Sequence, residues 1–266
     1  MVRNHHENQG TPMLAAVARE SMVRMAQTEK RSRSNRERTR SKTGWAGSCG
    51  VIGARSYTAV SVSIATLPSR AERLRLLDLL RQPAPAAALA LLGQVLVRHL
   101  RGRELCARIV EAEAYLPMGD PGAHVFRGRT PRVDPLFGPA GSIYVYFVYG
   151  MHHCLNLTVD KEGVPGCALI RAAELLDEHG RPGDDPSVCR GPARLCRTLG
   201  LSVRDSGANL FTPGARLTLR EGDPPPRIGR SPRIGLNVGT TLVLRFFDAE
   251  SAAVSGPRGS QGARWR

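Results

Sequence analysis

The stretch that decides this fold reads EAEAY at residues 111–115 and SIYVYFVY at residues 142–149. It holds four of the five tyrosines of the 266-residue chain, and one carboxylate, Glu113, lies between two alanines beside the first of them. Both segments have the composition of β-strands. Rings gathered beside a carboxylate are typical of a pocket for a flat ligand.

Side-chain alternation predicts which residues of the first segment are neighbours. In a strand over residues 105–116, Ile109, Glu111, Glu113 and Tyr115 would share one face, and the residues between them would share the other. Glu113 and Tyr115 are therefore expected to lie side by side.

The same period applied to the second segment separates its tyrosines. Tyr144 and Tyr146 are expected on one face, whereas Tyr149 points to the opposite face at the end of the strand. Gly150 follows it and can turn the backbone. One tyrosine can thus line a pocket while another points away from it.

Structural explanations of these residues stay open beside the chemical one. Aromatic residues are what strands prefer, so the tyrosines alone favour a core. Charged residues in an apolar strand, such as Glu111 and Glu113, face water, form pairs or do chemistry, and spacing alone does not choose among these. Asn156 and Arg171, polar residues of later strand candidates, are expected from their pattern to face solvent.

The charge of the chain indicates a polyanionic partner. Its formal net charge is +15, from 38 Lys and Arg against 23 Asp and Glu. Residues 1–70 carry 12 against 4, a net of +8, and the remainder carries 26 against 19, a net of +7. Nucleic acid is the commonest partner of a basic domain, although an anionic membrane surface or plain solubility would also fit.

Several classes of protein are not indicated. Neither a run of about 18 apolar residues nor a signal-peptide pattern is present, so we expect a soluble protein of the cytoplasm or nucleoid. The six cysteines form no CxxC pair and are expected to be reduced. Cysteine and histidine spacings match no zinc pattern, and neither a metal nor another cofactor is predicted.

Element signals begin near residue 70. Residues 1–70 are predicted to be a disordered basic extension, and residues 71–266 a single domain. The expected helices span residues 71–80, 84–92 and 191–199. The expected strands span residues 94–100, 104–116, 142–149, 153–159, 166–173, 215–221, 233–237 and 242–247. The first five of these strands read as an antiparallel meander, and the Gly- and Pro-rich loop 117–141 is expected to carry function.

Four motifs in this order resemble one family. They are LGQVLV at 92–97, IVEAEAY at 109–115, YVYFVYGM at 144–151 and GPARLC at 191–196. Between Leu74 and Arg258 the chain resembles the 3-methyladenine DNA glycosylases of the alkyladenine, or methylpurine, type. The resemblance implies a mixed α/β domain with a curved antiparallel sheet surrounded by helices. It also implies a monofunctional enzyme that cuts the N-glycosidic bond of a damaged purine with water.

The resemblance also assigns roles to residues around the damaged base. Glu113 matches the general base, and Arg171 matches the residue that helps to hold the catalytic water. Tyr115, His124 and Tyr146 match the residues that stack on the base. A carboxylate suits this chemistry, because it can deprotonate water and face the positive charge that develops on the sugar. A cationic alkylated purine leaves as a neutral base and does not need a strong general acid.

Three further residues match positions that read the base or the duplex. Asn156 matches the residue that rejects the exocyclic amine of guanine. Tyr149 matches the side chain that wedges into the duplex where a base is flipped out, and Met151 matches a DNA-contacting residue beside it. The pair His152 and His153 departs from the family, which has an aromatic or apolar pair there.

The expected partner is double-stranded DNA that contains damaged purines, bound by a monomer. Alkylated purines are the expected substrates, with deaminated or etheno purines as a further class. Few lysines occur in the domain, so lyase chemistry through a Schiff base is not expected. Two alternatives remain: a non-enzymatic nucleic-acid binder that uses the tyrosines as a stacking platform, and a hydrolase of free nucleosides.

Overall fold

The computed structural model describes residues 68–100 and 102–256. The predicted basic extension, residues 1–70, therefore lies outside the described residues except for its last three. The described helices are α2 (Arg70–Leu80), α3 (Ala84–Ala90) and α4 (Pro192–Thr198), with short 3-10 turns η1 (His124–Arg127), η2 (Asp134–Phe137) and η3 (Val203–Asp205). The strands are β1 (Val95–Leu100), β2 (Arg103–Tyr115), β3 (Ile143–Val148), β4 (His152–Val159), β5 (Gly166–Leu175), β6 (Leu217–Arg220), β7 (Ile228–Ser231) and β8 (Arg245–Asp248).

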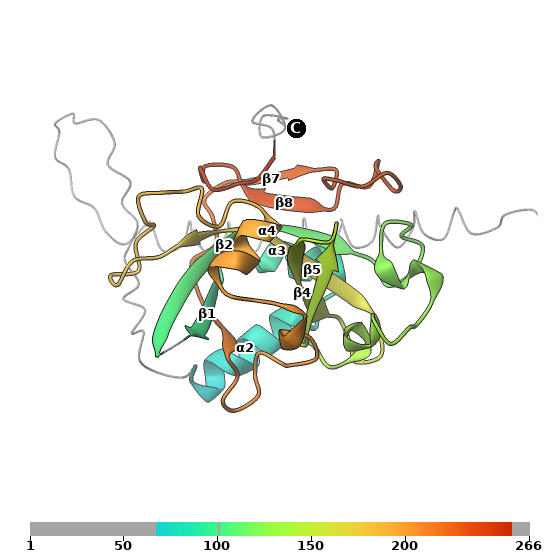
Figure 1. Ribbon diagram of the computed structural model, residues 1–266, viewed down its shortest axis with the longest axis horizontal. Helices are drawn as coiled ribbons and strands as arrows, with labels where there is room; N and C mark the ends of the chain where they lie inside the picture. Colours follow the sequence, from blue (N-terminus) through green and yellow to red (C-terminus); the bar gives the residue numbers. More distant parts are fainter. Residues whose placement is uncertain (1–67, 101, 257–266) are drawn as a thin grey trace, which may run out of the picture. The chain divides into compact units, whose positions relative to one another are not determined.

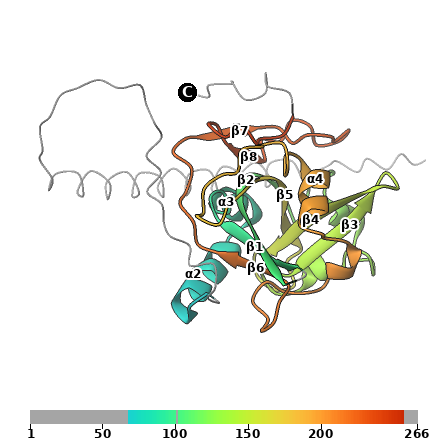
Figure 2. The same ribbon diagram turned by 60° about the vertical axis from the view of Figure 1, so that its left-hand side comes forward.

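The strands form one antiparallel sheet in the order β3-β4-β5-β2-β1-β6, and β8 pairs with β2 and β7 (Figures 1 and 2). This curled sheet with its few helices confirms the predicted mixed α/β fold. The predicted five-strand meander is wrong, because β2 pairs with β5 rather than with β3. The loop between β2 and β3 carries the chain to the far edge of the sheet, so β3 to β5 return toward β2.

Local signals explain the helix ends that the sequence predicted. The Ser69 side chain accepts a hydrogen bond from the Glu72 amide at 3.1 Å and caps α2. Gly93 follows α3 with φ +90°, and a Cβ there would lie 2.0 Å from the carbonyl oxygen of Asp223. Only glycine fits that position, both for its conformation and for the close approach of the backbone.

A bulge in β2 corrects the predicted face of Ile109. The pairing with β5 shifts register between Ile109 and Glu111 and again before Ala112. Ile109 and Ala112 consequently lie in the same core cluster, while Glu111 and Glu113 point away from it. A bulge inserts one extra residue into a strand and inverts the alternation beyond it, which the simple period of two cannot predict.

The main core occupies one face of the sheet and is closed by α3 and α4. Its buried members include residues from β2 to β5 together with helical residues such as Ala87 and Leu195. Residues that alternate with them, among them Tyr144, Asn156 and Arg171, fall on the other face. The loop between β2 and β3 covers part of that second face with a smaller cluster around Leu136 and Tyr144.

The strand predicted at residues 233–237 is displaced in the structure. Strand β7 instead covers Ile228–Ser231 and pairs with β8, a shorter strand that overlaps the predicted 242–247 segment and ends one residue beyond it. The chain between β7 and β8 is irregular and reaches the second face of the sheet through Arg233 and Ile234. Within the described part of the chain, no helix has the length and apolarity needed to cross a membrane.

Candidate active site

A pocket opens on the face of the sheet opposite the main core. Its walls come from the ends of β2 to β5, from the loop between β2 and β3, and from the chain between β7 and β8. The lining residues include Tyr115, His124, Tyr144, Tyr146, Asn156, Cys167 and Leu236. The cavity that they enclose has a volume of about 50 Å³, which is below the range of roughly 300–1,000 Å³ found for small-molecule sites.

Three rings form one wall of the pocket. The His124 ring meets Tyr146 edge to face, with centroids 4.4 Å apart, and the Tyr144 and Tyr146 centroids are 5.7 Å apart. Sequence analysis predicted Tyr146 and His124 as stacking residues, and the structure brings them together. It adds Tyr144, which was assigned no role although its spacing from Tyr146 already placed the two on one face.

A hydrogen bond joins two members of this ring wall. His124 Nδ1 lies 3.0 Å from the Tyr144 hydroxyl. Burial, and then the charge of Arg132, lower the pKa of His124, so the imidazole is neutral at neutral pH. Burial raises the pKa of Tyr144, which keeps its proton. A neutral imidazole and a protonated phenol can share one hydrogen between Nδ1 and the hydroxyl oxygen, and the tautomer of His124 decides which of them donates it.

Asn156 is buried in the pocket, so its expected solvent-facing position is wrong. Its Nδ2 donates to the Tyr144 carbonyl at 3.2 Å, and its Oδ1 lies 3.8 Å from the Cys167 thiol. Burial raises the pKa of Cys167 to about 12, so the thiol can donate that contact. Both ends of the amide are therefore oriented, which leaves the second Nδ2 hydrogen available to the pocket.

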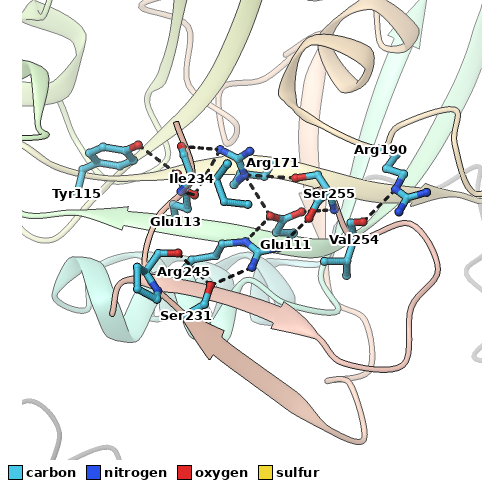
Figure 3. Close-up of polar contacts among 11 residues, drawn as sticks. Glu111, Glu113, Tyr115, Arg171, Arg190, Ser231, Ile234, Arg245, Val254 and Ser255 are labelled. Atoms are coloured by element: carbon cyan, nitrogen blue, oxygen red, sulfur yellow. Dashed lines mark hydrogen bonds and ion pairs between the residues drawn. The ribbon is translucent and has the colours of Figure 1, made fainter. Parts of the chain in front are cut away.

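Glu113 lies behind Tyr115 and has no exposed surface (Figure 3). Its Oε2 accepts from the Tyr115 hydroxyl at 3.1 Å, and its Oε1 accepts from the Ile234 amide at 2.8 Å. Arg171 Nη1 is 3.3 Å from the same Oε1. Burial raises the pKa of Glu113, a rise that Arg171 and the Ile234 amide oppose. A carboxylate with a raised pKa and a charged partner is well suited to accept a proton.

Arg171 connects Glu113 to a second buried carboxylate. Its Nε donates to Glu111 Oε1 at 3.1 Å, while its Nη1 faces Glu113. The expectation that this arginine faces solvent is wrong, since it is 8% exposed. Figure 3 shows its guanidinium between the two carboxylates. Two acidic residues of β2, separated by Ala112, thus share one arginine from β5.

Tyr149 and Met151 are absent from the pocket and lie on the turn between β3 and β4. They are 80% and 69% exposed, so a core role for Tyr149 is excluded. Tyr149 has φ +54° and Gly150 has φ +68°. Positive φ at both central positions is what a type I′ hairpin turn requires. A tyrosine in that conformation is uncommon and is a reason to look for function.

Arg233 and Asp120 were missed by sequence reasoning. Arg233 lies over the Tyr115 ring, 4.4 Å from its centroid. Its two Nη atoms pair with Asp120 at 2.6 Å each, and Asp120 also accepts from the Leu116 amide at 3.0 Å. The two residues are 113 positions apart, and no local pattern joins them. Together they fix the tyrosine at the end of β2.

The site offers proton transfer and stacking, with no cation-binding cluster in the part of the chain that is described. Among residues 68–100 and 102–256, no three His, Cys, Asp or Glu side chains gather where they could hold a metal ion. What the geometry provides is a ring-lined pocket, a buried carboxylate that a pocket tyrosine touches, and an exposed aromatic turn. The rings can hold a flat ligand by stacking, and the carboxylate can accept a proton, so these parts suit hydrolysis of a bond to a planar ring system.

Comparison with known proteins gives one consistent result. Residues 78–252, more than half of the chain, match the model of the methylpurine-DNA glycosylase (MPG) family. A protein of Trichodesmium erythraeum is 39% identical over 191 residues, which cover 66% of this chain and 94% of that protein. One of Myxococcus xanthus is 43% identical over 168 residues, covering 62% and 84%. One of Nocardia farcinica is 39% identical over 193 residues, covering 67% and 89%. All three carry the name "Putative 3-methyladenine DNA glycosylase".

Proposed function

The chain belongs to the methylpurine-DNA glycosylase family and is a DNA glycosylase, and on this premise we propose that it flips alkylated purines out of duplex DNA and hydrolyses their N-glycosidic bond with a water activated by Glu113. The observation that carries the proposal is the hydrogen bond between Glu113 and Tyr115. It joins a fully buried carboxylate directly to a ring of the pocket wall.

The flipped purine would enter among the rings of Tyr115, His124 and Tyr146. Stacking on aromatic side chains is sequence-tolerant and replaces part of the stacking that the base loses in the duplex. The fixed amide of Asn156 would present its Nδ2 hydrogen to the base edge. The exocyclic amine of guanine is also a hydrogen-bond donor, so the Asn156 amide would face it donor to donor and reject guanine. Hypoxanthine lacks this amine.

The chemical step would proceed as follows. Glu113 takes a proton from water, the water oxygen forms a bond to C1′ of the sugar, and the N-glycosidic bond breaks with its electron pair passing to the purine. An alkylated purine that carries a positive charge leaves as a neutral base. The enzyme would be monofunctional, because no amine takes part in this step.

Glu113 must become accessible for this reaction. Its carboxylate is enclosed by Tyr115, by the Ile234 amide and by Arg171. The proposal therefore requires the wall formed by Tyr115 or by the chain around Ile234 and Leu236 to yield when the nucleotide enters. Enclosure also strengthens the electrostatic interactions around the carboxylate, since water is excluded.

Tyr149 would fill the gap that the flipped nucleotide leaves, with Met151 beside it. Both are exposed and share a tight hairpin turn on which they can enter the duplex together. A ring inserted among the bases offsets part of the unstacking cost of a few kcal/mol. Neither a stacking platform nor a nucleoside hydrolase needs all of these parts, because the first has no use for Glu113 and the second none for Tyr149.

The test is base release from three substrates by the full chain. The substrates are duplex oligonucleotides containing a methylated purine, hypoxanthine or ethenoadenine, each against an undamaged duplex and the corresponding free nucleoside. We expect release from damaged duplexes alone, with the backbone left intact until alkali is added, and at least 100-fold less release with Glu113→Gln. Binding without release would indicate a platform, and cleavage of the free nucleoside alone would indicate the second alternative.

A further inference from the structure

The proposed mechanism leaves two buried charged residues, Glu111 and Arg245, without a role. Both have no exposed surface, and Arg245 Nε donates to Glu111 Oε1 at 2.6 Å. Burying charges costs several kcal/mol per ion, and hydrophobic replacements are often as stable. Stability alone is therefore a weak reason for charges in this position, directly beneath Arg171 and Glu113.

Glu111 is held from three directions (Figure 3). Its Oε1 accepts from Arg245 and, at 3.1 Å, from Arg171 Nε. Its Oε2 accepts from the Ser255 amide at 2.6 Å. Each donor comes from a different segment: β8, β5 and the chain that follows β8. The carboxylate cannot rotate without breaking one of these bonds.

Arg245 is equally constrained, which makes it a fixed support for Glu111. Its Nη1 donates to the Ser231 hydroxyl at 2.9 Å, and its Nη2 donates to the Ser255 carbonyl at 2.8 Å. The guanidinium also lies over the Phe247 ring, 4.4 Å from its centroid. All three guanidinium nitrogens of Arg245 thus donate a hydrogen bond, and its ion pair is with Glu111 rather than with Glu113.

From this geometry we propose that Glu111, held by Arg245 and the Ser255 amide, is a positioning residue that orients Arg171 toward Glu113. Arg171 Nε is bound by Glu111, and this bond turns Nη1 toward Glu113 at 3.3 Å. The inference rests on the proposed role of Glu113 as the base. It extends the site to two residues that do not touch the pocket.

Glu111 also acts on Glu113 through its charge. The groups that face Glu113 are Glu111 and Tyr115 on β2, Cys154 on β4, Arg171 on β5, and Arg233 and the Ile234 amide between β7 and β8. Burial is the main cause of the raised pKa of Glu113; Arg171 and the Ile234 amide lower this pKa, and the negative charge of Glu111 raises it further. Glu111 thus keeps Glu113 basic beside an arginine that would otherwise weaken it as a proton acceptor.

The test is the pH profile of single-turnover base release by variants of the full chain. Glu111→Gln removes the negative charge and loosens Arg171. We expect the acidic limb of the profile to move to lower pH and the plateau rate to fall roughly ten- to a hundredfold, as misplacement by about 1 Å would produce. Arg245→Met removes the positive charge that pairs with Glu111. The negative charge of Glu111 is then less compensated and raises the pKa of Glu113, so the acidic limb of this variant should move to higher pH.

The double variant Glu111→Gln/Arg245→Met leaves no uncompensated buried charge and keeps the test available if a single variant does not fold. Its limb should lie between those of the two single variants. Arg98→Met is the matched control, because Arg98 is equally buried and bonded to Leu199, Gly200 and Asp205, away from the pocket. It should lose stability without moving the limb. Limbs that stay at the wild-type pH in the Glu111 and Arg245 variants would overturn the inference.

A second readout separates this inference from the proposed function. The infrared band of the protonated Glu113 carboxyl, identified by its loss in Glu113→Gln, reports titration of that group without any turnover. We expect Glu111→Gln to lower the pH at which the band disappears. If Glu113→Gln retained base release while the band still shifted, the proposed function would fail and the coupling of the two carboxylates would stand. An unshifted band with normal wild-type release would reject the coupling alone.

Discussion

The two faces of the central strands perform different work although they are built from alternating residues of the same segments. On β4, Leu157 lies in the apolar core beneath α3 and α4, and its neighbour Asn156 lies in the ring-lined pocket. On β2, Ala112 likewise lies in the core, and its neighbour Glu113 lies on the face of the pocket. One face consists of small and aliphatic side chains, and the other buries carboxylates, arginines and tyrosines.

This difference shows where the free energy of the fold and the chemistry of the site reside. Apolar burial on the core face contributes about 25 cal/mol for each Å² removed from water. The second face buries charges whose desolvation opposes folding and whose pairing only compensates for it. Substitutions on the two faces should therefore separate loss of stability from loss of activity, which the following experiments test.

The largest effect is expected for Glu113→Gln. The amide keeps the shape of the side chain but cannot accept a proton from water, so base release should fall by roughly 10²- to 10⁴-fold. Damaged DNA should still bind, and the protein should remain folded. Single-turnover kinetics and binding isotherms on the same duplex measure both properties. Near-normal release would remove Glu113 from the mechanism.

Leu157→Ala tests the opposite face. It should lower the free energy of unfolding by about 2–5 kcal/mol, since Leu157 is fully buried in the core cluster. Denaturant titration measures this loss. Activity per folded molecule should stay close to that of wild type at low temperature. If activity per folded molecule fell as well, the core face and the pocket face would not be independent of each other.

A smaller effect is expected at Tyr149, which belongs to neither buried face. Tyr149→Ser should leave the melting temperature unchanged, because the ring is 80% exposed. Base release from a well-paired lesion should fall roughly tenfold, with a smaller loss for a mispaired one that flips more easily. Leu74→Ser on α2, also an exposed apolar side chain, is the control and should change neither property. Equal losses on both duplexes would contradict the wedge.

The smallest effect concerns stability as a function of pH. Glu113 has a raised pKa in the folded protein, so the folded state binds its proton more tightly than the unfolded state does. Its contribution to stability is present below the ordinary glutamate pKa and is lost as pH rises through the raised value. Glu113→Gln has no carboxyl group to deprotonate at this position, so it does not lose this stability as pH rises. Its stability relative to wild type should therefore increase with pH across that window, and unfolding titrations at several pH values would measure it.

Sequence periodicity predicted most of the elements because local physics governs them. The helix before Gly93 and the hairpin of β1 and β2 follow from capping and alternation within a few residues. Tyr149, expected as the last residue of a strand, lies instead on the turn that follows β3. The family resemblance then gave residue numbers to the pocket, and His124, Tyr146 and Asn156 do meet there. The faces of β2 were predicted correctly only beyond its bulge, because nothing local marks an extra residue.

The sequence by itself determined the family, the fold class and the presence of a carboxylate among rings. Only the tertiary structure decided what surrounds that carboxylate. The register of β2 against β5 brings Arg171 between Glu111 and Glu113, and the chain around β7 and β8 adds Ile234, Arg245 and the approach of Arg233 to Tyr115. These partners lie more than 50 positions from the residues they hold. Contacts over such separations depend on how the whole sheet closes, which no window of sequence contains.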